Sequence, residues 1–169
     1  MISAIVYTSN SGYTAEYARM LGKLTGLPVN DLRQVHNPQP QREVIFLGWL
    51  MADNIMGYAK ASRFYKVRAV CQVGMGPATR TASDRLRQKL KLGPEVQVFT
   101  LQGGFDIRRL HGPYKWIMQV KCREIRRNLE SKESLTPAQQ LTYDMAAKGA
   151  SAVKQENLTE IVNWYKTTL

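Results

Sequence analysis

This sequence has few cysteines, few acidic residues and no long apolar run. Its 169 residues include only Cys71 and Cys122, with no CxxC pair and no histidine near either in sequence, so we expect neither a zinc site nor a disulfide framework. No run approaches the roughly 20 apolar residues of a membrane span, and no signal-peptide pattern precedes the first apolar stretch. We therefore expect one cytoplasmic domain, 1–169, whose two thiols are reduced and buried.

Acidic residues are scarce enough to make the chain strongly basic. There are 13 Asp and Glu against 24 Lys and Arg, which gives a formal net charge of +11 at pH 7. The segment Arg108–Lys132 holds eight basic and two acidic residues. With Trp116 among them, it is typical of a segment that meets an anionic membrane, at the inner face, or an acidic partner protein; a plain solvated face is the alternative. No aromatic platform or helix-turn-helix spacing supports nucleic acid as the partner.

Short apolar runs alternate with helical patterns along the first two thirds of the chain. Parallel strands need crossover connections, and helical crossovers cover both faces of the sheet that they connect. The pattern therefore predicts an α/β fold with a doubly wound five-stranded parallel sheet and helices on both faces. The predicted strands are 2–7, 28–32, 43–48, 67–73 and 96–101.

The rest of the chain shows helical patterns. We predict crossover helices that begin near residues 13, 56 and 77, and then a helical extension, 113–150, after the fifth strand. Within the extension, Thr136-Pro137 with Gln139 has the pattern of a capping box. A last helix, 157–167, has apolar residues at helical spacing and is expected to pack on the sheet.

The turn after the first strand is rich in hydroxyl groups and leads directly into a helix. The first amides of a helix have no partner within it and lie at the positive end of its dipole, so such a turn can bind an anion without Lys or Arg. An ordinary strand-to-helix turn with one capping hydroxyl is the alternative. The predicted phosphate contacts are the side chains of Ser9, Ser11 and Thr14 and the backbone N–H groups of Asn10, Gly12 and Tyr13.

Two further loops are expected at the same edge of the sheet, where ligands of doubly wound folds bind. The loop after the third strand, expected over 49–54, brings Trp49, Leu50 and Met51. The loop after the fifth strand brings Gln102, Gly103, Gly104 and Phe105, whose glycines allow backbone to approach a flat ligand. Together the three loops predict a site for a phosphorylated aromatic cofactor. The alternatives are that Trp49 is a packing residue and that Gly103-Gly104 is a tight turn.

The segment 9–14, SNSGYT, directly after the first strand resembles the phosphate loop of the flavodoxin family. The resemblance implies the strand order 2-1-3-4-5 and noncovalent FMN with its phosphate in this loop. It also implies that 47–52 covers one face of the isoalloxazine and that 101–106 lines its other side. Typical electron-carrying flavodoxins are acidic, whereas this chain is basic. The basic segment after the fifth strand resembles that of the flavodoxin-like, menaquinone-dependent protoporphyrinogen dehydrogenases.

Three functions are compatible with these patterns. The first is an FMN-binding redox protein that exchanges electrons or hydride equivalents with a redox partner protein, a small molecule or a quinone. The second is a quinone-linked enzyme that oxidises protoporphyrinogen or a similar substrate at the membrane surface. The third is a module that binds phosphate or a nucleotide without redox function. No residue is predicted as a catalytic acid, base or nucleophile, since Asp53 and Asp106 are expected to be caps or turn formers.

Overall fold

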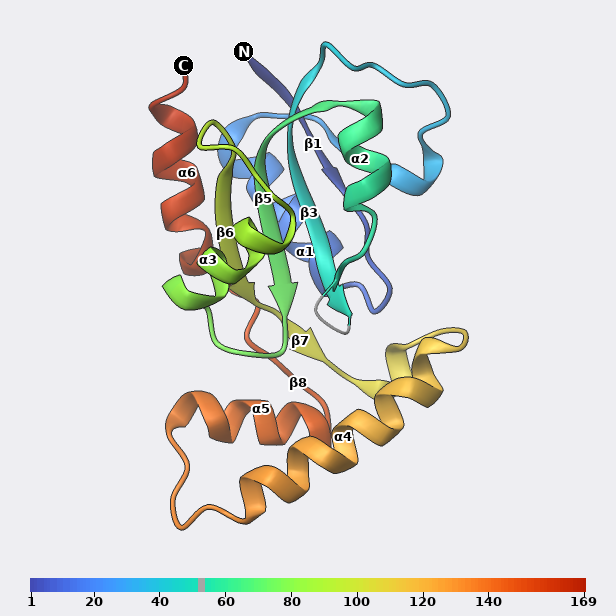
Figure 1. Cartoon of the computed structure of the whole chain (residues 1–169), viewed down its shortest axis with the longest axis vertical. Coiled ribbons are helices and arrows are strands. Elements are labelled where there is room, and N and C mark those ends of the chain that lie inside the picture. Colours follow the sequence, from blue (N-terminus) through green and yellow to red (C-terminus); the bar gives the residue numbers. More distant parts are fainter. Residues whose placement is uncertain (52–53) are drawn as a thin grey trace.

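A sheet of five parallel strands forms the centre of the computed structural model, which describes residues 1–51 and 54–169 (Figure 1). The strand order, β2-β1-β3-β5-β6, corresponds to the predicted order 2-1-3-4-5, and all neighbours in it pair in parallel. The doubly wound, flavodoxin-like architecture is therefore confirmed. The strands are β1 (Ile2–Tyr7), β2 (Val29–Asp31), β3 (Glu43–Met51), β5 (Lys66–Gly74) and β6 (Gln97–Gln102).

Helices cover both faces of this sheet. Consecutive strand residues point to opposite faces, so the buried Ile5 and Val6 of β1 belong to two different core clusters. The first cluster lies under α1 (Tyr13–Thr25) and α6 (Thr159–Lys166), and the second lies under α2 (Tyr58–Phe64) and α3 (Arg80–Lys89). Burial on both faces explains why the strands read as continuous apolar runs. Short 3-10 turns are η1 (Leu32–Gln34), η2 (Ile107–Arg109) and η3 (Gln155–Leu158).

The predicted extension is a pair of helices with a small core of its own. It consists of α4 (Tyr114–Glu130) and α5 (Pro137–Ala147), joined to the sheet by β7 (Gly104–Phe105) and β8 (Ala150–Ser151), which pair antiparallel. The predicted capping box at Thr136 is present. Figure 1 shows the pair beyond the carboxyl ends of the sheet strands. The extension therefore lies at the edge where the ligand was predicted. Its core contains the buried residues Phe105, Leu110, Cys122 and Met145.

The predicted loop 49–54 is wrong in its described part. Strand β3 continues to Met51, and β4 (Asn54–Ile55) folds back against it, with Leu50 paired to Ile55. A Cβ atom on Gly48 would collide with Ile55, so glycine at this position is what lets the hairpin fold closely onto the strand. Residues 52 and 53, and with them the predicted role of Asp53, lie outside the described residues.

At the opposite end of the sheet, Glu43, the first residue of β3, forms a group of ion pairs. Its carboxylate lies 2.9 Å from the N-terminal ammonium, 3.0 Å from Lys66 Nζ and 2.9 Å from Arg68 Nη1. The ammonium, Lys66 and Arg68 together lower the pKa of Glu43 from 4.5 to about 2. The ion pairs connect the amino ends of β1, β3 and β5, on the side of the sheet away from the predicted ligand.

Both cysteines are free and buried, as predicted. Cys71 lies in the first sheet cluster and Cys122 lies in the core of the extension. Burial raises the pKa of both thiols above the ordinary value. The two residues therefore belong to separate cores and are packing residues.

Candidate functional site

The β1–α1 turn has the backbone geometry of an anion-binding helix start. Gly12 precedes α1 with φ at +96°, in the left-handed region that glycine adopts without strain, and its N–H donates to Ser9 Oγ at 3.1 Å. Glu16 N–H bonds back to the Gly12 carbonyl at 3.0 Å. The amides of the first turn before Glu16 have no acceptor within the helix and face the turn.

The hydroxyl groups of this turn have different roles. The Ser9 hydroxyl is used within the turn, because it accepts the bond from Gly12. In the described part of the chain, the hydroxyls of Ser11 and Thr14 have no hydrogen-bond partner, although Thr14 is buried. Two unpaired hydroxyls and a set of unpaired amides form a donor set that fits a phosphate monoester. The turn thus offers these donors without a basic residue of its own.

The three residues of β3 that were predicted to contact the flavin ring lie in different environments. The Trp49 ring lies edge-on to the ring of Tyr114, the first residue of α4, with centroids 5.2 Å apart. Leu50 lines a cavity of about 440 Å³ on the α3 side of the sheet, and Met51 is buried. Of the three, Trp49 is the one that lies beside the extension.

The predicted contacts after β6 pack mainly against the protein itself. Gln102 donates from Nε2 to the Met75 carbonyl at 3.0 Å. A Cβ atom on Gly104 would collide with the ring of Tyr13, so the close approach that this glycine permits is to Tyr13. The Gly103 N–H bonds to the Gly74 carbonyl at 2.8 Å, so this residue continues the pairing of β6 with β5 instead of forming the alternative tight turn. Phe105 lies in the core of the extension.

The segment between β7 and α4 lies directly on the phosphate turn. The Arg109 guanidinium is stacked over the Tyr13 ring, 4.9 Å from its centroid, and the His111 N–H donates to Asn10 Oδ1 at 3.2 Å. Sequence reasoning placed Arg109 only in the general basic segment and did not bring it to this turn. The contact joins residues almost a hundred positions apart, and no local pattern signals it.

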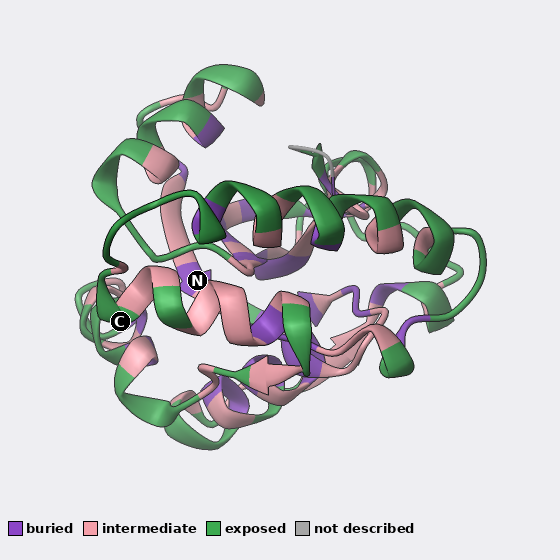
Figure 2. Cartoon of the chain, turned by 90° about the horizontal axis from the view of Figure 1, so that it is seen from below, coloured by how far each residue is buried: buried purple, intermediate pink, exposed green. Residues whose placement is uncertain are grey.

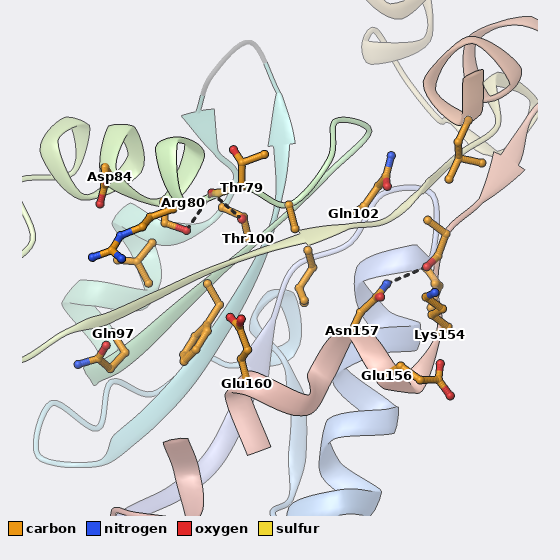
Figure 3. Close-up of a pocket in the computed structure, with 18 of the residues that line it drawn as sticks. Thr79, Arg80, Asp84, Gln97, Thr100, Gln102, Lys154, Glu156, Asn157 and Glu160 are labelled. Carbon is orange, nitrogen blue, oxygen red and sulfur yellow. Dashed lines mark hydrogen bonds between the residues drawn. The ribbon is translucent and has the colours of Figure 1, made fainter. Parts of the chain in front are cut away.

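A larger cavity than the one beside Leu50 lies elsewhere, along the free edge of β6 (Figure 3). It measures about 1060 Å³ and lies between the start of α3, with Thr79 and Arg80, and η3, with Glu156 and Asn157. Thr100 of β6 bonds through its hydroxyl to the Thr79 carbonyl at one side. None of the predicted site residues except Gln102 lines this cavity.

The candidate site offers hydroxyl and amide donors, and the described residues give it no metal centre. Across residues 1–51 and 54–169, no group of three or more His, Cys, Asp or Glu side chains could hold a metal ion. No model of a known protein family matches the chain, and the comparison with curated proteins gives no match. The function is therefore inferred from the geometry of the turn and of the segment that lies on it.

Proposed function

We propose that this chain binds FMN at the β1–α1 turn and acts as a flavodoxin-like redox protein. The observation that carries the proposal is the donor set of the turn: unpaired first-turn amides behind Gly12 and the unpaired hydroxyls of Ser11 and Thr14. The turn follows β1, which lies between β2 and β3. The chain passes from β1 to β2 on one side and then crosses to β3 on the other, so the strand order reverses at β1. Ligands of doubly wound folds bind at this switch point.

Each part of the chain has a binding role in this proposal. The turn holds the phosphate through amides and hydroxyls, and Trp49 flanks the flavin ring. Bound FMN supplies the exchange of electrons or hydride equivalents, which no side chain of the site can supply. An external redox partner, protein or small molecule, completes the reaction.

The absorbance spectrum of the protein as purified is the first test, followed by titration with FMN and riboflavin. The double variant Ser11→Ala, Thr14→Ala removes two hydroxyl bonds to a charged group, and we expect FMN affinity to fall by roughly tenfold or more. Thr25→Ala is the matched control, because its hydroxyl bonds to the Leu21 carbonyl at the far end of α1. Absence of FMN binding by the unaltered protein would exclude the redox function. Binding of inorganic phosphate alone would then favour the phosphate-binding module.

A second candidate function, a quinone-linked oxidation at a membrane surface, is favoured by the outer face of α4. Trp116, Ile117 and Val120 are 75%, 49% and 65% exposed, while Cys122 and Leu129 of the same helix are buried. Figure 2 shows α4 largely exposed when the chain is seen from below. No helix of the described residues is long and apolar enough to span a membrane. The exposed side chains of Trp116, Ile117 and Val120 would be buried if α4 lay in the interface of a bilayer.

The charges next to this apolar group fit an anionic bilayer. At 100° per residue, Trp116, Val120, Arg123 and Arg127 fall on one side of α4, opposite the buried side. An apolar half with a tryptophan, followed by a basic half, is the composition of helices that lie in the headgroup region of anionic membranes. A lipid-soluble quinone would be within reach of a protein bound in this way.

Cosedimentation with phosphatidylserine-containing and neutral vesicles tests the membrane contact. We expect binding to the anionic vesicles, and loss of most of it when Trp116, Ile117 and Val120 are all changed to serine. Leu24→Ser is the control, since Leu24 is 38% exposed on α1. Equal binding of the triple variant and the control would remove this candidate and leave an acidic protein as the partner. Quinone-dependent oxidation of protoporphyrinogen by the FMN-loaded protein tests the enzymatic step.

A further inference from the structure

We infer that Arg109 is a phosphate-binding residue of the site, through which the chain selects FMN over riboflavin. The inference rests on the proposed FMN site and adds to it a charged ligand from outside the β1–α1 turn. It concerns one exposed side chain in η2, between the sheet and the extension.

The position of Arg109 is set by contacts on both sides of it. Its guanidinium is stacked on Tyr13, the first residue of α1, and Tyr13 is only 6% exposed and therefore cannot move away. Two residues later, His111 N–H bonds to Asn10 Oδ1, and between them Leu110 is anchored in the core of the extension. The backbone of this segment is thus held on the turn, and the guanidinium is held over the ring of the first residue of α1.

Arg109 differs from its neighbour in how its charge is used. Arg108 binds Asp106 with both Nε and Nη2, at 2.9 and 2.8 Å, and also donates to the Lys148 carbonyl. This pairing lowers the pKa of Asp106. Arg109 has no ion pair with any carboxylate in the described ranges. Arg108 is therefore committed to the structure, whereas Arg109 acts on Asp106 only at longer range and forms no ion pair with a described residue.

The unpaired charge lies next to a second positive potential. The start of α1 carries the positive end of its helix dipole, and two positive groups side by side repel each other. An anion placed between them turns this repulsion into attraction on both sides. The unpaired hydroxyl of Thr14, a residue that is only 2% exposed, adds a donor at the same helix start. The arrangement favours an anion of high charge density with several acceptor oxygens.

A phosphate monoester has these properties, and riboflavin lacks the group altogether. A guanidinium donates two parallel N–H bonds to a phosphate and carries a full positive charge, which the hydroxyls and amides of the turn lack. The charge of Arg109 therefore acts on FMN and leaves the affinity for the uncharged flavin nearly unchanged.

The test compares FMN and riboflavin affinities of the unaltered chain, Arg109→Gln, Arg109→Lys and the control Arg123→Gln, which makes the same change in net charge on the outer side of α4. We expect Arg109→Gln to weaken FMN binding by roughly tenfold or more, with riboflavin changed by less than about twofold. The lysine variant should regain part of the loss, because it keeps the charge without the planar fork. Melting curves establish that each variant is folded.

The outcomes separate this inference from the proposed function. If the unaltered chain binds FMN and Arg109→Gln binds it equally well, or loses FMN and riboflavin to the same degree, the inference is overturned while the FMN site stands. If the unaltered chain binds neither FMN nor inorganic phosphate, both fail. A steeper loss of FMN affinity with added salt in the unaltered chain than in Arg109→Gln supports the inference.

Discussion

The hydroxyl group of Tyr17 connects three parts of the chain that meet beside the candidate site. It belongs to α1, donates to the Gln102 carbonyl at the end of β6 at 2.6 Å, and accepts from Asn157 Nδ2 at 2.6 Å. The side chain is fully buried, and burial raises its pKa. Replacement by phenylalanine keeps the ring and removes only these bonds, so it measures what the connection contributes to stability.

The expected loss follows from the groups left behind. In Tyr17→Phe the Gln102 carbonyl loses this donor, while Asn157 Nδ2 retains its bond to the Ala152 carbonyl at 2.9 Å (Figure 3). A buried polar group without a partner costs about 1–3 kcal/mol. Of the two groups that bond to the Tyr17 hydroxyl, the Asn157 amide keeps another hydrogen bond, so it adds little to this cost. We expect a loss of about 2 kcal/mol in the free energy of unfolding. For a chain of this length that corresponds to roughly 4–8 °C in Tm.

Urea denaturation followed by circular dichroism measures this difference, and Tyr58→Phe is its matched control. Tyr58 is half-buried against Phe46, and its hydroxyl has no hydrogen bond to a residue in the described ranges. Removing that hydroxyl should change stability by less than about 0.5 kcal/mol. The reasoning is refuted if Tyr17→Phe is as stable as the unaltered chain, or if the two variants lose the same amount.

Two further predictions concern the two ends of the sheet. Glu43→Gln removes a carboxylate whose pKa is lowered to about 2 in the folded state. Such a group stabilises the fold fully above its unfolded pKa and loses this effect as the pH falls towards 2. Two of its partners, the N-terminal ammonium and Lys66, are well exposed, so we expect the variant to lose only about 1–2 kcal/mol of unfolding free energy at pH 7. Denaturation at each pH should show this difference shrinking between about pH 5 and 2. Gly104→Ala places a methyl group against the Tyr13 ring and should lower the free energy of unfolding by about 1–3 kcal/mol, measured by thermal or urea denaturation. Gly76→Ala is the control and should be neutral, because a Cβ at that position meets no atom within 4 Å. Equal effects of the two substitutions would contradict the packing argument.

Local patterns were sufficient wherever the deciding interaction is itself local or periodic. The strands were predicted because burial on both faces selects continuous apolar runs. The last helix was predicted because Leu158, Ile161 and Tyr165 share one stripe, and all three are buried in the first sheet cluster. The capping box at Thr136 depends on residues three positions apart.

Predictions were wrong or incomplete where contacts between distant segments decide the outcome. Residues 49–51, predicted as part of a loop, extend β3, and Ile55 of β4 packs on Gly48, which no periodic pattern shows. Gly104 was assigned to a ligand, and the structure places the Tyr13 ring against it. Phe105 was assigned to the same loop, and it lies in the core of the extension, where α4 and α5 bury it.

The sequence by itself determined the doubly wound sheet, because apolar runs and helical periodicity are properties of neighbouring residues. It also determined which donor groups the turn at 9–14 offers, because its hydroxyls and its glycine lie within six consecutive residues. Only the tertiary structure decided what lies on that turn. The sheet brings the end of β6 next to the start of α1, and the chain then folds back so that Arg109 stacks on Tyr13 and His111 bonds to Asn10. Such contacts depend on how the crossovers place distant segments at one sheet edge. For that reason two residues of the basic segment, Arg109 and His111, lie on the turn, which composition alone could not indicate.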